Sequence, residues 1–168
     1  MKARAAFLQA VLLVLYFAYG SNLDWAQMQR RCPDAQFRCV AKLPDHRLIF
    51  PRTSDRWQGG GVASVTPDSG QVVWGVVYEI TPADLDSLDG FEGCQPGASD
   101  NNYNRETIRV YDRGRMKKPL DVQVYRAVPQ GQHFAPSAAY MKALLDGADH
   151  WKLPELYIED LKRIETAR

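Results

Sequence analysis

The residue with the clearest chemical potential is a glutamate that follows an apolar side chain and precedes a glycine. Glu92 lies in Phe91-Glu92-Gly93, one helical turn after Leu88. A carboxylate held beside apolar side chains is partly desolvated, and desolvation raises its pKa towards the range that a general acid–base needs. From spacing alone, a surface glutamate in a turn is the competing interpretation, because several other carboxylates lie nearby in the sequence.

A second candidate is the turn Tyr19-Gly20-Ser21-Asn22, which directly follows a continuous apolar run. A glycine after a buried strand lets the backbone approach a ligand closely. The N-terminus of a following helix offers free N–H groups to a carboxylate or an oxyanion. An ordinary strand-to-helix connection is the alternative. The turn lacks the Gly-Lys-Ser/Thr of a P-loop, so the pattern does not indicate a nucleotide phosphate.

Metal and cofactor motifs are absent from the sequence. It holds no zinc spacing, calcium loop or Gly-x-Ser-x-Gly elbow. The three cysteines, Cys32, Cys39 and Cys94, are odd in number and irregularly spaced, which argues against a disulfide framework. We therefore expect no metal and no cofactor, and three reduced, buried thiols in a cytoplasmic protein.

Composition limits the class of protein. The chain has 168 residues, of which 45% are hydrophobic and 24% charged, as in an ordinary globular domain. Lys and Arg number 21 against 20 Asp and Glu, for a formal net charge of +1. No basic surplus is available to neutralise a phosphate backbone, so we expect no nucleic-acid partner.

The N-terminus can be interpreted in two ways. Lys2 and Arg4 precede an apolar run, as in a short signal peptide, and the run is short for a membrane span. Cleavage after Gly20 would destroy the turn described above. We therefore expect an N-terminal extension over residues 1–13, irregular or helical, then a single domain over 14–168 that is cytoplasmic and not bound to a membrane. A cleaved signal is the minority interpretation.

The hydrophobic patterning predicts about seven strands and few helices, with two of the helices late in the chain. The class is therefore α+β, and a small mixed or closed β-barrel with flanking helices fits it. Pro44-Asp45 is predicted to join a hairpin-like pair, and residues 67–70 to form a β-turn. The expected strands cover residues 11–18, 36–43, 46–50, 62–65, 72–80, 103–111 and 122–128, and the expected helices 24–31, 82–88, 137–145 and 155–164.

The block LYFAYGSNL, residues 15–23, resembles the N-terminal signature of the γ-glutamylcyclotransferases. Later blocks resemble the same family in order: CVAKLPDHRLIF (39–50), WQGGGVASV (57–65), VVWGVVYEI (72–80), LDSLDGFEG (85–93), PSAAYMKALLDGA (136–148) and LPELYIEDLKRIE (153–165). The resemblance covers residues 14–165. It implies a small mixed β-barrel with flanking helices, and it aligns Glu92 with the family's catalytic acid–base.

The resemblance also implies a substrate site and a reaction. The implied substrate-binding residues are Tyr16, Phe17, Ala18, Tyr19, Gly20, Ser21, Asn22 and Tyr140. The implied reaction is the cyclisation of a small γ-glutamyl amino acid to 5-oxoproline with release of the free amino acid, without a cofactor. A homodimer is a candidate assembly.

Two alternative functions stay open, one within this superfamily and one of another functional class. The superfamily also contains γ-glutamylamine and glutathione-specific cyclotransferases, although YGSNL favours the branch that acts on γ-glutamyl amino acids. A barrel that binds γ-glutamyl ligands without turnover is the alternative of another class. The sequence departs from the family in its apolar extension and in a longer loop over residues 95–102, which we expect to alter substrate access because it follows Glu92 closely.

Overall fold

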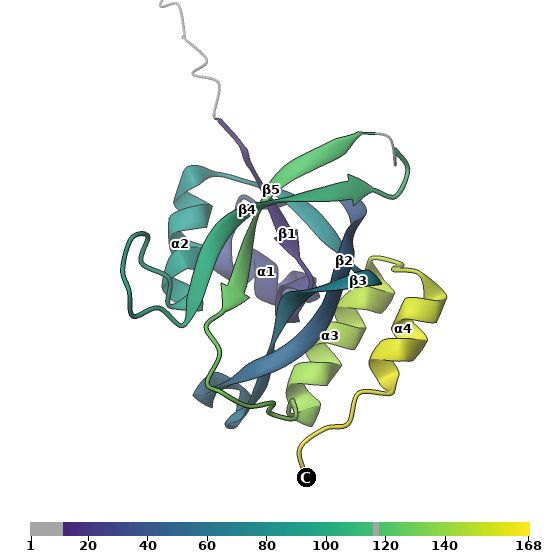
Figure 1. Cartoon of the computed structure of the whole chain (residues 1–168). Coiled ribbons are helices and arrows are strands. Elements are labelled where there is room, and N and C mark those ends of the chain that lie inside the picture. Colours follow the sequence, from purple (N-terminus) through teal and green to yellow (C-terminus); the bar gives the residue numbers. More distant parts are fainter. Residues whose placement is uncertain (1–11, 116–117) are drawn as a thin grey trace, which may run out of the picture.

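A closed barrel of five strands forms the centre of the part of the chain that the structure describes (Figure 1). The structure is a computed structural model, and it describes residues 12–115 and 118–168. The strands follow one another around the barrel in the order β1-β3-β2-β4-β5, and β5 returns to β1. Their bounds are β1 Val14–Ala18, β2 Gln36–Ser54, β3 Gly60–Ile80, β4 Tyr103–Asp112 and β5 Pro119–Ala127. The predicted α+β class and mixed barrel are confirmed.

The barrel is mixed because one of its pairings is parallel. β1 runs parallel to β5, with Tyr16 opposite Gln123, and the other neighbouring strands are antiparallel. The long β2 and β3 pair from Gln36–Glu79 to Ser54–Gly60, with three shifts of register along the way. Such bulges bend a strand and increase its twist. They let two strands curve around much of a small barrel.

The predicted number of strands was wrong because turn residues were taken for chain reversals. Residues 36–43 and 46–50 are two parts of β2 and do not form a hairpin, since both pair with β3. Between them Asp45 adopts a positive φ of 54°, and its carboxylate accepts the N–H of Gly70 at 2.9 Å. The register places residues 68–71 of β3 opposite Asp45 alone, so the predicted turn over residues 67–70 falls in a bulge of β3, and residues 62–65 and 72–80 belong to that one strand.

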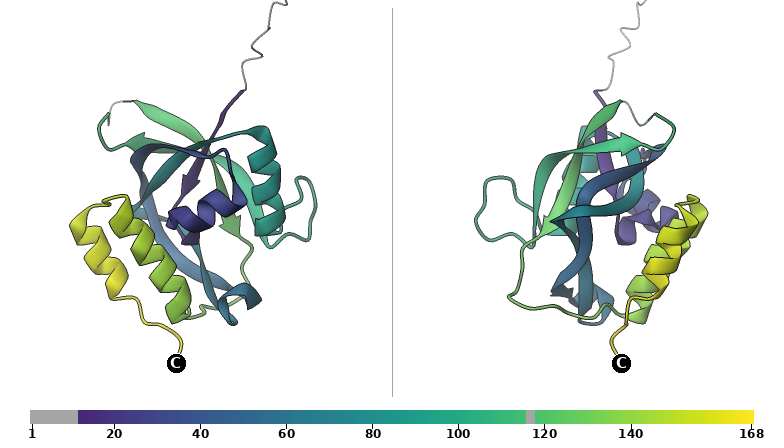
Figure 2. Two further views of the ribbon diagram at one scale, coloured as in Figure 1. Left: turned by 180° about the vertical axis from the view of Figure 1, so that it is seen from behind. Right: turned by 45° about the vertical axis from the view of Figure 1, so that its right-hand side comes forward.

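Helices cover the outside of the barrel. In Figures 1 and 2, α3 and α4 lie side by side on one flank and α2 lies on the opposite one. The bounds are η1 Ser21–Leu23, α1 Trp25–Arg31, η2 Asp55–Trp57, α2 Pro82–Glu92, α3 Ala138–His150 and α4 Glu155–Lys162, where η denotes a 3₁₀ turn. No helix in the described part of the chain is long and apolar enough to cross a membrane.

Helix α2 is one turn longer than the sequence predicted. Thr81 and Asp84 form a capping box at its start, and Pro82 occupies the first turn. The predicted end at Leu88 was wrong, because Gly90 continues the helix and Gly93, at φ 58°, ends it in the left-handed conformation. Glu92 is therefore the last helical residue and does not lie in a loop.

The start of the barrel also differs from the prediction. The strand predicted over residues 11–18 begins at Val14, while Leu12 and Leu13 precede it with exposed side chains. Most of the predicted N-terminal extension, residues 1–11, lies outside the described residues. From Val14 onwards the apolar side chains of β1 join a core that continues to α4.

Helix α3 packs directly on the turn that follows β1. A Cβ at Gly147 would lie 2.3 Å from the backbone carbon of Leu23, so only glycine permits this approach. The indole Nε1 of Trp151 donates to the carbonyl of Leu23 at 3.0 Å. The contacts from Gly147 and Trp151 therefore hold η1, which contains Ser21 and Asn22 of the candidate turn, against α3.

Candidate active site

A cavity of about 690 Å³ opens between the turn after β1, the end of α2 and the N-terminal half of α3. This volume is in the range of small-molecule sites. Of the residues proposed from sequence, Glu92 and six others line it, namely Tyr16, Tyr19, Gly20, Ser21, Asn22 and Tyr140. The structure therefore brings together two candidates that are about 70 residues apart in the chain.

Phe17 and Ala18 do not line the cavity. Both are buried, with exposed fractions of 0% and 1%. They pack against β3, where a Cβ at Gly75 would meet the carbonyl oxygen of Ala18 and the ring of Phe17. Their place is in the wall and core of the barrel.

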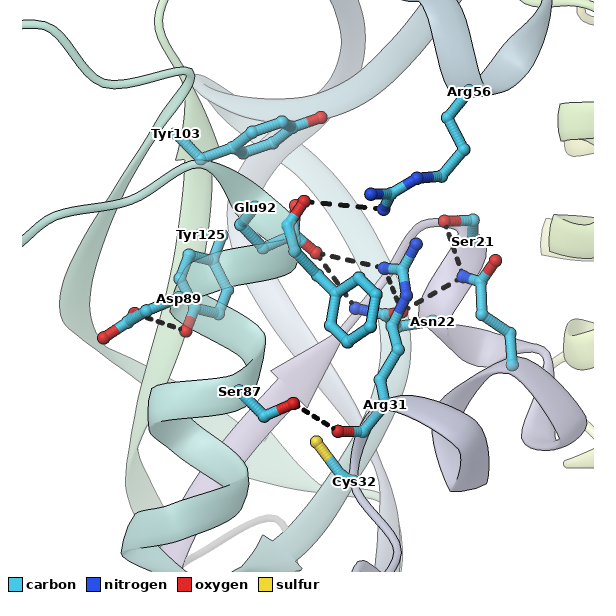
Figure 3. A network of polar contacts seen from close by, with 12 residues as sticks. Ser21, Asn22, Arg31, Cys32, Arg56, Ser87, Asp89, Glu92, Tyr103 and Tyr125 are labelled. Atoms are coloured by element: carbon cyan, nitrogen blue, oxygen red, sulfur yellow. Dashed lines mark hydrogen bonds and ion pairs between the residues drawn. The ribbon is translucent and has the colours of Figure 1, made fainter.

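Glu92 is held in a largely buried position with two donors on one of its oxygens. Its side chain is 14% exposed. Oε1 accepts the Asn22 amide at 3.2 Å and the Arg31 guanidinium at 3.4 Å (Figure 3). Burial raises the pKa of Glu92, and Arg31, Asn22 and Arg56 oppose that rise. Oε2 accepts no hydrogen bond from residues 12–115 or 118–168, so this oxygen is open to a ligand.

Asn22 fixes the geometry around the carboxylate. Its Nδ2 donates to the Tyr16 hydroxyl at 2.8 Å as well as to Glu92. Its Oδ1 accepts Nη1 of Arg31 at 2.9 Å and Nε2 of Gln27 at 3.1 Å. Both ends of a buried amide are thus satisfied, which sets its orientation. Asn22 therefore links the turn directly to the carboxylate of Glu92.

Arg31 is a site residue that the sequence analysis missed. Its side chain is 7% exposed and contacts both Asn22 and Glu92. Burial lowers its pKa from the usual value, while the charge of Glu92 opposes that change. A buried guanidinium needs such partners. The available signal was the spacing of Gln27 and Arg31, which places two polar residues on one face of α1.

Tyr140 approaches the turn from α3. Its hydroxyl accepts the Ala63 N–H at 3.0 Å. Burial raises the pKa of Tyr140 to about 12, although the backbone N–H groups of Ala63 and Ser21 oppose the rise. The hydroxyl is therefore protonated at neutral pH and can donate to a bound anion. A Cβ at Gly20 would lie 2.7 Å from this hydroxyl, so the contact requires glycine.

A buried network behind Glu92 holds the end of α2. Asp89 accepts the Tyr125 hydroxyl at 2.7 Å and Nη1 of Arg105 at 2.7 Å. The Tyr19 hydroxyl in turn donates to the backbone carbonyl of Tyr125. These bonds connect the last turn of α2 to β4 and β5, and Figure 3 shows Asp89 and Tyr125 meeting on the side of α2 away from Arg31.

The rim of the cavity includes residues 52–57, which contain η2, and Asn102 from the loop that follows α2. Asn101 closes this loop through its bonds to Gln95, and Asn102 donates its N–H to the Gly93 carbonyl at 2.9 Å. Asn102 lines the cavity and its Oδ1 accepts Nη2 of Arg52 at 2.6 Å. The effect of the loop on substrate access stays a prediction. Among the described residues, no three His, Cys, Asp or Glu side chains are grouped as metal ligands.

Comparison with known proteins gives one consistent family. The AIG2-like family model matches residues 72–161. The gamma-glutamylcyclotransferases of Mus musculus and Homo sapiens are each 37% identical over 155 residues, covering 90% of this chain and 78% of theirs. A solved structure described as a gamma-glutamyl cyclotransferase superposes with a TM-score of 0.84 at 34% identity, covering 93% of this chain and 90% of that one.

Proposed function

This chain belongs to the γ-glutamylcyclotransferases, and on that premise we propose that it converts γ-glutamyl amino acids to 5-oxoproline and the free amino acid. The observation that carries the proposal is the open Oε2 of Glu92, a buried carboxylate of raised pKa beside the turn Gly20-Ser21-Asn22. Glu92 is the proposed catalytic acid–base.

The first step uses the nucleophile that the substrate carries. The α-amine of a γ-glutamyl group, with a pKa of roughly 8, is mainly protonated at neutral pH and must lose a proton before it attacks. Glu92 accepts that proton at Oε2, while Arg31 and Asn22 hold Oε1. The amine then adds to the γ-carbonyl carbon and forms the five-membered ring. Holding the substrate folded for this attack supplies much of the rate enhancement.

The second step breaks the amide bond. The tetrahedral intermediate carries a negative oxygen, and N–H donors stabilise such an oxyanion. In η1 the N–H of Leu23 bonds to the Gly20 carbonyl, and the N–H of Ser21 is directed at the Tyr140 hydroxyl, so the donors that remain beside the cavity are the other N–H groups of the turn. We assign those groups and the Tyr140 hydroxyl to the oxyanion or to the substrate's α-carboxylate. After the attack the ring nitrogen still carries two protons, and it gives one of them to solvent. Glu92 returns its own proton to the leaving nitrogen, and the carbon–nitrogen bond breaks without consuming water.

The remaining assignments follow the same site. Tyr16 and Tyr19 are proposed to contact the substrate from the end of β1, because both line the cavity. We propose that residues 14–168 act as one domain, since the site draws on elements from β1 to α3. The three free, buried cysteines support a reducing compartment such as the cytoplasm. The homodimer stays a prediction.

The test is a product assay on the purified protein. γ-Glutamyl-alanine should yield 5-oxoproline and alanine in equal amounts. The isomer α-glutamyl-alanine is the control, because its alanine is attached to the α-carbonyl and cannot leave by five-membered ring closure. Binding of γ-glutamyl-alanine without product would instead support the non-catalytic barrel, and turnover of γ-glutamyl-lysine linked through its side chain alone would support the γ-glutamylamine branch.

A further inference from the structure

One cation of the cavity has no role in the reaction described above. Arg56 lies in η2, lines the cavity and has an exposed side chain. Its guanidinium extends from the rim towards Glu92 (Figure 3). The charge is close enough to oppose the rise in the pKa of Glu92. Arg56 therefore stands beside the reacting groups, on the open side of the site.

The other two arginines that line the cavity already donate hydrogen bonds to protein groups. Arg31 is buried and bonded to Asn22 and Glu92. Arg52 donates to the Val128 carbonyl at 3.0 Å and to Asn102 at 2.6 Å. Within the described part of the chain, Arg56 forms no ion pair, and its one hydrogen bond is a long one of 3.5 Å to the Phe91 carbonyl. Among the three arginines that line the cavity, Arg56 therefore has the most N–H donors available to a ligand.

The orientation of Arg56 is nevertheless defined. Its guanidinium carbon lies 5.3 Å from the centre of the Phe91 ring, and that of Arg31 lies 5.0 Å from the same ring. A guanidinium attracted to an aromatic ring loses part of its freedom before a ligand arrives. Because Phe91 directly precedes Glu92, this contact keeps the Arg56 guanidinium next to the helical turn that carries the proposed acid–base.

The chemistry of the substrate places an anion at this point. The leaving nitrogen must reach Oε2 of Glu92 to take up its proton. In a γ-glutamyl amino acid, the α-carboxylate of the leaving residue is two covalent bonds from that nitrogen. A carboxylate so close to Glu92 needs a cation to offset the repulsion, and a planar guanidinium suits it.

We propose that Arg56 binds the α-carboxylate of the leaving amino acid and thereby makes this chain select γ-glutamyl amino acids over γ-glutamylamines. This inference rests on the function proposed above and names the residue that would determine its specificity. The contact belongs to the leaving group, so it predicts an effect that depends on the presence of that one carboxylate.

The test compares two substrates that differ only in this group, γ-glutamyl-alanine and γ-glutamyl-ethylamine. We expect Arg56→Gln to lower kcat/KM for γ-glutamyl-alanine about 10-fold, mainly through KM. Losing a hydrogen bond to a charged group lowers affinity by about this factor at the lower end of its usual range. For γ-glutamyl-ethylamine, kcat/KM should change less than about 2-fold on the same reasoning. The ratio of the two values cancels any shift in the pKa of Glu92. Arg56→Lys should restore part of the ratio, and the exposed Arg109→Gln is the matched control.

Two results would overturn the proposal. An equal loss on both substrates would place Arg56 on the γ-glutamyl end, and no loss on either would leave the carboxylate in solvent. If the wild-type protein forms no product from either substrate, the proposed function fails by itself. The calorimetric affinity for each compound then still tests Arg56, because only the affinity for γ-glutamyl-alanine should fall in Arg56→Gln.

Discussion

The contact between Gly20 and Tyr140 supports a prediction whose size follows from the structure. In Gly20→Ala, the new methyl group would lie 2.7 Å from the Tyr140 hydroxyl and 3.4 Å from the Ala63 side chain. The hydroxyl must move, and the buried N–H of Ala63 then loses its acceptor. Leaving a buried donor unsatisfied costs about 1–3 kcal/mol. We therefore expect Gly20→Ala to lower the free energy of unfolding by at least that amount.

Removing the hydroxyl should remove the cost of the methyl group. In Tyr140→Phe the nearest ring atom, Cζ, is 3.9 Å from the position of the new Cβ, which is ordinary contact distance. The hydrogen bond to Ala63 is already lost there, so Gly20→Ala should cost less than about 1 kcal/mol in this background. Urea denaturation of the four proteins should give a coupling energy of about 1–3 kcal/mol.

Gly90→Ala is the matched control for this cycle. A Cβ at Gly90, inside α2, meets nothing within 4 Å, so it should add to Tyr140→Phe without coupling. Kinetic measurements test the role of Tyr140 in substrate binding. Tyr140→Phe alone should lower kcat/KM roughly 10–150-fold if the hydroxyl bonds a charged substrate group. Additivity of Gly20→Ala and Tyr140→Phe within about 0.5 kcal/mol would refute the inferred contact.

Two further predictions concern the groups that surround Glu92. Arg31→Met removes a charge that lowers the pKa of Glu92, so this pKa should rise further. The acidic limb of the plot of kcat/KM against pH should therefore move to higher pH. An acidic limb at or below the wild-type pH would contradict the assigned contact. Asp89→Asn weakens the bonds to Tyr125 and Arg105, and should lower the free energy of unfolding by about 1–3 kcal/mol in urea denaturation, whereas a change under about 0.5 kcal/mol would show that this network does not hold α2.

The barrel class and the two parts of the candidate site could be predicted from local patterns and from the resemblance. The apolar run before Gly20 and the apolar neighbours of Glu92 are local features. Their meeting in space could not be derived from spacing, because Asn22 and Glu92 are 70 residues apart and their contact depends on how α2 packs beside η1.

The errors have physical causes as well. Pro44-Asp45 has turn chemistry, but pairing with β3 on both sides kept β2 continuous, and the extra residues are residues 68–71 of β3, opposite Asp45. The helix predicted over residues 82–88 was too short because, of the two glycines that follow it, Gly90 stays helical and only Gly93 takes a positive φ. Arg31 and Arg56 carried no motif, since the chemistry of an arginine in a site depends on its burial and partners rather than on its sequence neighbours.

The central claim is that Glu92 transfers the proton in ring closure, and Glu92→Gln tests it most directly. The substitution keeps the shape of the side chain and the acceptor for Arg31 and Asn22, but an amide cannot take up the amine proton. 5-Oxoproline release from γ-glutamyl-alanine should fall at least about 10²–10⁴-fold, the usual contribution of a general acid–base. The variant should still bind the substrate in calorimetry, which shows that the site is intact. A folded Glu92→Gln protein with near wild-type kcat would contradict the account.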